Sequence, residues 1–203
     1  WRGCGVERLM PEYYAHSENS HDEKHRLSKH LHQTAQLAES FACQEYYKPI
    51  FKLTGLLHDF GKYQPAFQDY LINGGSRGSV PHAAWGAGLA RLIGGLEASI
   101  TIDGHHKGLP DKSAWKGDTE PFKRGEVSAF EEIKQAFISD AKIGKSDLSN
   151  FDFSMFAGKG QESLREVFIR YLFSALTDSD WLSTEEHFES EKYQMRIGAV
   201  LPI

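Results

Sequence analysis

The chain has 203 residues, of which 40% are hydrophobic and 25% charged, with 23 lysines and arginines against 28 acidic residues and a net charge of −5. This length allows one domain or at most two, and it is enough to bury a full core. The composition excludes collagen, coiled coils and wholesale disorder, and no apolar run approaches the roughly 20 residues of a membrane span.

The first half of the sequence predicts three helices. Apolar residues recur at three- and four-residue spacing over residues 23–47, which predicts one long amphipathic helix. Pro49 can lie in the first turn of a second helix over residues 50–59, which is apolar on several faces and should therefore be central and buried. A short third helix is expected over 65–71, and a glycine-rich loop over 73–79.

Beyond residue 80 the pattern alternates between helices and loops. Helices are expected over three segments, 81–96, 128–143 and 162 to about 183. Two longer stretches are expected to be loops, residues 107–124 and 144–160. A short apolar piece lies over 98–102, and the one candidate strand lies near 197–201. We therefore expect a single all-α domain over residues 1–203.

Neither the cysteines nor the first residues indicate export. Cys4 and Cys43 form no C-x-x-C pair, so neither a disulfide framework nor a cysteine zinc site is indicated. The first residues, 1–4, show no basic-then-apolar signal peptide, and a reducing cytoplasm is the expected compartment. The first residue is not Met, which suggests a trimmed chain or a fragment of a longer protein.

The unusual feature is a set of ten histidines, the commonest metal-ligand type. Six lie on or beside expected helices: His16, His30, His58, His82, His105 and His106. Asp59 follows His58 directly, and Asp178 and Asp180 lie in the last helix. A helical bundle can project such residues into one cavity. A lone histidine is more often an ordinary surface or core residue than a ligand. Four histidines have polar neighbours in the sequence and are therefore interpreted as ordinary residues: His21, His25, His32 and His187.

Adjacent histidine and aspartate residues suit a site with two metal ions. The aspartate of His58-Asp59 can bridge two neighbouring ions, and two ions about 3.5–4 Å apart can clamp the attacking and leaving oxygens of a phosphoryl substrate. Mixed imidazole and carboxylate ligands suit Zn, Fe, Mn, Co or Ni, with Mg as an alternative. The expected cofactor is therefore a divalent metal, bound as two ions.

Several of these residues lie in motifs of a known family. Residues 55–62, Gly-Leu-Leu-His-Asp-Phe-Gly-Lys, resemble the signature of the HD-domain metal-dependent phosphohydrolases. Residues 61–71 are similar to the GK-x-x-x-x-FQ-x-YL stretch of the CRISPR-associated HD nuclease, the nuclease part of the type I nuclease-helicase. Further segments resemble that family's motifs in the same order: 15–17, 27–31, 81–82, 105–110 and 178–185. The resemblance spans about residues 13–186 and implies an HD-domain helical bundle with a central metal site.

The resemblance also implies roles for individual residues. One ion would be held by His30, His58, Asp59 and a C-terminal aspartate, and the second by Asp59, His82, His105 and His106. Asp180 is placed as the C-terminal ligand because it precedes Trp181, as in the family's A-D-W pattern; Asp178 is the rival, on another side of the helix. Asp59 and Lys62 would be catalytic, with Lys62 neutralising the scissile phosphate, and His16 would line the site or support its ligands.

The implied function is hydrolysis of phosphodiester bonds in single-stranded DNA during CRISPR interference against foreign DNA. The implied partners are a CRISPR helicase and an RNA-guided surveillance complex in a prokaryotic cytoplasm, with no membrane involved. The 107–124 stretch carries a small excess of basic residues with Trp115 and Phe122, which can guide a DNA strand by stacking; an ordinary solvated loop is the alternative. The negative net charge argues weakly against a non-specific nucleic-acid binder.

No nucleotide cofactor is expected. Residues 144–146, Gly-Lys-Ser, end like a Walker motif, but Ser139 stands where the first glycine belongs and no strand precedes it. The chain is therefore expected to be a stand-alone nuclease or a domain linked to a helicase at its C-terminus, without ATP hydrolysis of its own.

Two other functions stay open. A general HD phosphohydrolase acting on nucleotides would use the same His58-Asp59 chemistry, although the Phe67-Gln68 and 105–108 stretches favour the nuclease. A non-catalytic recruitment module that keeps a metal for stability belongs to a different class of protein.

Overall fold

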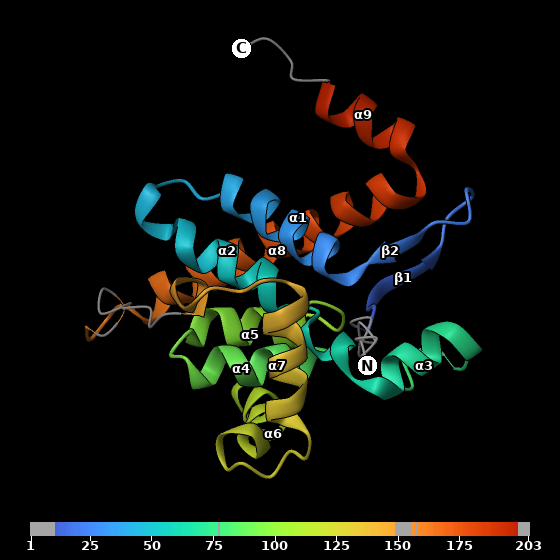
Figure 1. Ribbon diagram of the computed structural model, residues 1–203. Helices are drawn as coiled ribbons and strands as arrows, with labels where there is room; N and C mark the ends of the chain where they lie inside the picture. Colours follow the sequence, from blue (N-terminus) through green and yellow to red (C-terminus); the bar gives the residue numbers. More distant parts are fainter. Residues whose placement is uncertain (1–10, 77, 149–155, 157, 199–203) are drawn as a thin grey trace, which may run out of the picture.

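The structure is a computed structural model, and it describes residues 11–76, 78–148, 156 and 158–198. Over these residues the fold is all-α with one small two-stranded sheet, which confirms the expected fold class (Figure 1). The α-helices are α1 (Leu27–Ser40), α2 (Lys48–Leu57), α3 (Pro65–Asn73), α4 (Ala83–Leu92), α5 (Leu96–Gly104), α6 (Lys112–Lys123), α7 (Phe130–Asp140), α8 (Glu162–Phe188) and α9 (Ser190–Gly198). The strands are β1 (Tyr14–Glu18) and β2 (Lys24–Arg26). Among the described helices, none combines the length and the apolar character that crossing a bilayer requires.

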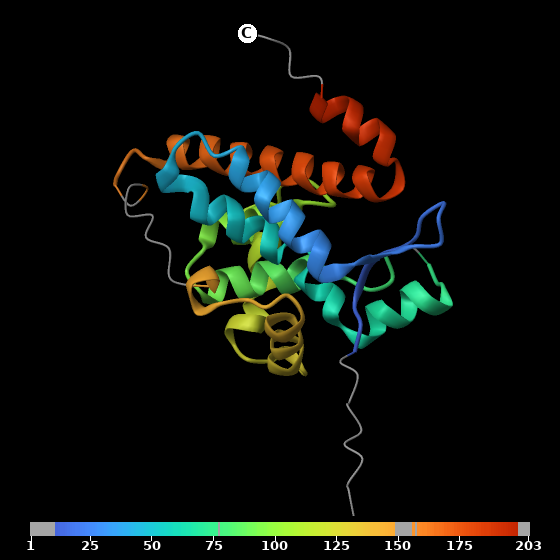
Figure 2. The same ribbon diagram turned by 45° about the horizontal axis from the view of Figure 1, so that its top comes forward.

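Helix α2 is the central element of the bundle. It contacts α1, α4, α5 and α8, and all of its residues from Leu53 to Leu57 are buried. Figures 1 and 2 show α1 and α8 beside α2 on one side of the bundle and α4 and α5 on the other. Helix α3 lies apart from this core, next to the β1–β2 hairpin. The expectation of a central, buried second helix is confirmed.

Two glycines set how closely the helices approach α2. A Cβ atom added at Gly55 would lie 2.5 Å from the Cα atom of Ala35 in α1, and one added at Gly86 in α4 would lie 2.0 Å from the carbonyl oxygen of Leu57. Backbone atoms cannot give way to such contacts, so both helix pairs need glycine at these points. His58 follows α2 directly, and His82 directly precedes α4. The close crossing of these two helices therefore brings His82 near the end of α2, where its Nε2 atom lies 3.3 Å from Oδ1 of Asp59.

Replacing Gly86 with Ala is expected to destabilise the protein. The added methyl group overlaps the Leu57 carbonyl, and overpacking of this kind costs about 1–3 kcal/mol, which corresponds to a fall in Tm of about 2–12 °C for a chain of this size. The matched control is Gly117→Ala in α6, where an added Cβ has nothing within 4 Å. Differential scanning calorimetry should show a lower Tm only for Gly86→Ala; equal Tm values for the two variants would contradict the packing argument.

The predicted helix over 23–47 is wrong at both ends. Residues 24–26 form β2, which pairs antiparallel with β1, and the helix itself runs only from Leu27 to Ser40. The hairpin forms because the Asn19 side chain accepts hydrogen bonds from the backbone N–H groups of His21 and Glu23, a turn that competes with helix. A short 3-10 helix, Glu45–Tyr47, replaces the expected helical end.

The predicted loop over 107–124 is also wrong, because α6 occupies most of it. The Asp111 side chain caps the helix by accepting hydrogen bonds from the N–H groups of Ser113 and Ala114. Trp115, Thr119 and Phe122 follow at spacings of four and three residues and form the buried face of the helix. Since both aromatic rings are buried, they offer no surface on which the bases of a DNA strand could stack.

The remaining differences concern boundaries. The helix expected over 81–96 ends at Leu92, because Gly94 turns the chain with a φ of 86°, and the apolar 98–102 piece belongs to α5. Helix α8 continues past the expected end near residue 183 to Phe188. The candidate strand near 197–201 is wrong where it can be checked, because Ile197 lies within α9, which ends at Gly198. Residues 199–203 lie outside the described residues.

Candidate metal centre

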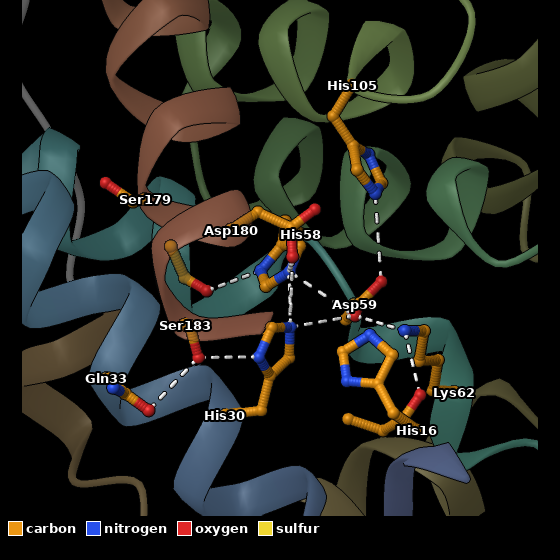
Figure 3. A network of polar contacts seen from close by, with 12 residues as sticks. His16, His30, Gln33, His58, Asp59, Lys62, His105, Ser179, Asp180 and Ser183 are labelled. Atoms are coloured by element: carbon orange, nitrogen blue, oxygen red, sulfur yellow. Dashed lines mark hydrogen bonds and ion pairs between the residues drawn. The ribbon is translucent and has the colours of Figure 1, made fainter. Parts of the chain in front are cut away.

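The candidate site is built around the C-terminal end of α2. His58 directly follows this helix and Asp59 leads into a 3-10 helix, Phe60–Tyr63, and both side chains are almost completely buried. Other elements deliver the remaining side chains to the same place, and Figure 3 shows His30, His105 and Asp180 among them. All seven residues expected as metal ligands are brought together in two groups that can hold a metal ion: His30, His58, Asp59, His82, His105, His106 and Asp180.

The first group consists of His30, His58, Asp59 and Asp180. The Nε2 atom of His30 lies 3.1 Å from Nε2 of His58, 3.2 Å from Oδ2 of Asp59 and 3.3 Å from Oδ1 of Asp180. His58 Nε2 lies 3.3 Å from the same Asp59 oxygen and 3.6 Å from the same Asp180 oxygen. Tetrahedral zinc-type ligands with bonds of 2.0–2.1 Å are about 3.3–3.4 Å apart. These five separations of 3.1–3.6 Å are therefore close to those of a tetrahedral coordination shell.

The second group uses the other oxygen of Asp59. Oδ1 lies 3.3 Å from Nε2 of His82 and 3.7 Å from Nε2 of His105. The Nε2 atoms of His82 and His106 are 2.8 Å apart. Asp59 thus directs Oδ2 into one group and Oδ1 into the other, which is the arrangement of a carboxylate that bridges two ions.

Hydrogen bonds fix which ring nitrogen faces the cluster. His58 and His105 each donate their Nδ1–H to the carbonyl oxygen three residues earlier, at 2.8 and 2.7 Å. His30 places Nδ1 2.9 Å from the Ser183 hydroxyl, which in turn donates to the Gln33 side-chain oxygen at 3.1 Å, so Nδ1 of His30 is the donor. Each ring therefore directs its Nε2 atom toward the cluster, as metal-bound histidines with a supporting shell do.

Two buried atoms of the cluster show that a cation fits it. Among the described residues, Asp59 Oδ1 and His105 Nε2 are buried without a hydrogen-bond partner. Leaving such atoms unsatisfied costs about 1–3 kcal/mol each. Both are electron-pair donors, and a divalent ion would satisfy both. The imidazole and carboxylate donors, the distances between their ligand atoms and these two unsatisfied atoms all fit a metal site, which several divalent ions could occupy.

The charges of the cluster are strongly coupled. Burial lowers the pKa of His58, but the carboxylates of Asp59 and Asp180 outweigh burial and raise this pKa to about 10. Burial likewise opposes ionisation of Asp59, but Lys62 and His58 hold its pKa well below the usual range. The buried Lys62 ammonium lies 2.6 Å from Asp59 Oδ2 and donates to the Ala15 carbonyl oxygen at 3.1 Å. Lys62 is thus placed at the cluster, as expected.

Of the two rival aspartates, the structure brings Asp180 to the cluster. Asp180 lies on the inner side of α8, while Asp178 is exposed and belongs to neither ligand group. Residues two positions apart on a helix point about 200° apart, which is why only one of the pair can face inward.

A third histidine group adjoins the first. Nδ1 of His16 lies 3.1 Å from Nδ1 of His25, the His25 ring stacks on His187 at 4.5 Å, and the His16 ring is 4.9 Å from that of His30. His16 was expected at the site, but the interpretation of His25 and His187 as ordinary residues missed their position beside it. His16 and His25 face each other across the hairpin, so recognising the β1–β2 turn would have been the signal.

Acidification is expected to destabilise the chelator-treated protein below about pH 6.5. Burial, followed by nearby cationic groups, lowers the pKa of both His16 and His25 to about 2. Their unfolded pKa is about 6.5, so between the two values the unfolded chain binds more protons, and stability falls as pH falls. Each histidine contributes up to about a tenfold change in the folding constant per pH unit.

Acid unfolding followed by circular dichroism checks this expectation. The double variant His16→Gln/His25→Gln should unfold less steeply with falling pH than the wild type, while His21→Gln, an exposed control in the hairpin turn, should not differ from it. An unchanged slope in the double variant would refute the assignment of buried neutral imidazoles.

Neither comparison with known proteins identifies a family. A scan of the chain against protein-family models found no match, and a search of curated proteins found none. Function is therefore inferred from the chemistry of the cluster and from the motif resemblance.

Proposed function

We propose that this protein is a metal-dependent nuclease that hydrolyses phosphodiester bonds of single-stranded DNA. The observation that carries the proposal is the division of the Asp59 carboxylate between two ligand groups, with the Lys62 ammonium beside it. His30, His58, Asp59 and Asp180 would hold one divalent ion, and Asp59 with His82, His105 and His106 would hold a second. Such a pair of ions supplies Lewis acidity, which activates water and offsets the charge that develops on a phosphoryl group.

The chain's own residues prepare the site for an anionic substrate. Three members of the first group, His30, His58 and Asp59, have side chains at most 2% exposed, and this shielding from water strengthens the electrostatic interactions among them. Lys62 both orients Asp59 and lines a cavity that opens beside the cluster, so its ammonium can reach a phosphate oxygen from that cavity. Histidine-rich ligation favours a transition metal such as Mn, Fe, Co, Ni or Zn over Mg.

The biological setting of the proposal rests on the motif resemblance. A nuclease of this kind acts in CRISPR interference against foreign DNA, with a helicase and an RNA-guided complex delivering the strand in a prokaryotic cytoplasm. The stretch over residues 61–71, which includes Lys62 at the cluster, supports this setting over a nucleotide hydrolase.

The test combines metal analysis with a substrate panel. The protein is loaded with Mn, Co, Ni, Zn or Mg, and its metal content is measured by elemental analysis and anomalous scattering. It is then incubated with a labelled single-stranded 30-mer, with bis(p-nitrophenyl) phosphate and with nucleotides. We expect about two ions per chain, chelator-sensitive cleavage of the 30-mer and hydrolysis of the small diester. Hydrolysis of nucleotides alone would reject the nuclease, and metal-dependent melting without any hydrolysis would favour a recruitment module.

A further inference from the structure

A cavity of about 480 Å³ opens directly from the candidate metal centre. Four of its lining residues belong to the cluster or adjoin it: His16, Lys62, His82 and His106. A group held at the cluster through these side chains therefore extends into the cavity. Its volume falls within the roughly 300–1,000 Å³ of typical small-ligand pockets.

The rest of the cavity wall is apolar and rich in aromatic rings. Phe67 and Tyr70 of α3 contribute adjacent rings, with centroids 5.9 Å apart, and the Phe67 ring lies 5.2 Å from that of His82. Phe188, at the end of α8, lies against His16 with centroids 5.9 Å apart and is 38% exposed. Aromatic rings from two separate helices thus line the cavity into which a cluster-bound phosphate would project its nucleoside.

The Tyr70 ring is held in place by the loop that follows α3. A Cβ atom added at Gly75 would lie 3.0 Å from the Cδ2 atom of this ring, so the loop backbone comes close to the ring. A larger residue at this position would require the ring to shift. A ring supported in this way can stack against a ligand with less loss of side-chain freedom.

A second cavity is larger but unconnected to this chemistry. It has a volume of about 560 Å³ and lies between α5, α6 and α8, where Leu96, Trp115 and Arg165 contribute to its lining. None of the described cluster residues lines it. Of these two cavities, the smaller one adjoins the metal centre.

We infer that this smaller cavity is a nucleobase subsite, which stacks the base next to the scissile phosphate on Tyr70 and Phe188. The inference rests on the proposed nuclease function and names how its substrate is bound. Stacking is tolerant of sequence because every base presents a π-face, so the site selects unpaired bases rather than a particular sequence. A base paired in a duplex is already stacked and cannot enter.

Binding of a fluorescent trinucleotide tests the subsite separately from cleavage. The probe is single-stranded, carries 2-aminopurine at its centre and has phosphorothioate linkages that slow hydrolysis; stacking quenches its fluorescence. Tyr70→Ala and Phe188→Ala are expected to weaken binding by about 5- to 100-fold and to reduce the quenching. Tyr70→Trp should restore both. Ile72→Ala is the matched control, since Ile72 lies on the same helix but is 65% exposed and outside the cavity lining.

Hydrolysis of bis(p-nitrophenyl) phosphate and of the 30-mer by the wild type, together with the metal content of the variants, separates failure of the subsite from failure of the proposed function. Tyr70 belongs to neither ligand group, so Tyr70→Ala should keep the wild-type ion content while losing affinity for the trinucleotide. Wild-type trinucleotide affinity and quenching in Tyr70→Ala would overturn the subsite even if the enzyme cleaves DNA. A wild-type protein that hydrolyses neither substrate would overturn the proposed function, and the binding series would still decide the subsite.

Discussion

Replacing Asp59 with Asn is expected to remove tight metal binding at both groups and to lower phosphodiester cleavage by at least about 1,000-fold. The Asp59 oxygens lie 3.2–3.3 Å from His30 and His58 on one side and 3.3 Å from His82 on the other. An amide is neutral and offers only one strong donor atom, so it cannot bridge two cations. Elemental analysis and the rate of 30-mer cleavage measure the two effects.

A loss of fold must be distinguished from a loss of metal in this variant. Asp59 is also the counter-ion of the buried Lys62 ammonium, and removing one partner of a buried ion pair costs about 3–5 kcal/mol. The double variant Asp59→Asn/Lys62→Met removes both charges, so its melting temperature should recover toward that of the chelated wild type while metal binding stays lost. An Asp59→Asn protein that retains two ions and full cleavage would refute the bridging role.

The central part of the site was accessible from sequence because its signals are local. The apolar run of α2 identified a buried helix, and an ionisable pair, His58-Asp59, at the end of such a run is costly without partners. The other ligands are separated from this pair by tens of residues. Their meeting depends on helix crossings such as that of Gly86 with Leu57, which periodicity cannot reveal. Motif resemblance, rather than pattern, supplied the expectation that they converge.

The parts that sequence reasoning missed have two physical causes. The β1–β2 hairpin depends on one side chain, Asn19, bonding to backbone groups of a turn, and two of the three residues of β2 are charged, so no alternation marks the strand. This concealed His25 beside the site. Helix α6 was predicted as a loop because it contains Gly117 and Pro121, which are common in loops. Its capping residue, Asp111, and its buried face, which includes Trp115, stabilise the helix nevertheless.

Replacing Asp180 with Asn is expected to remove about one ion per chain and to reduce cleavage by at least about 100-fold, whereas Asp178→Asn should leave both unchanged. Asp180 Oδ1 lies 3.3 Å from His30 Nε2 and 3.6 Å from His58 Nε2. Asp180 is therefore a ligand of the first group. It is not a member of the second group, which should therefore retain its ion.

The two aspartates form a matched pair for this test. Both lie on α8 and both substitutions remove one negative charge, so a general electrostatic effect on DNA binding would change both variants equally. A position-specific loss at Asp180 therefore reports ligation. Elemental analysis and the pseudo-first-order cleavage rate should separate the variants, and melting temperatures in chelator measure any difference in folding independently of the metal. Equal ion content in the two variants, or a loss at Asp178 instead, would show that α8 contributes its ligand from another face and that the first group is incorrectly assigned.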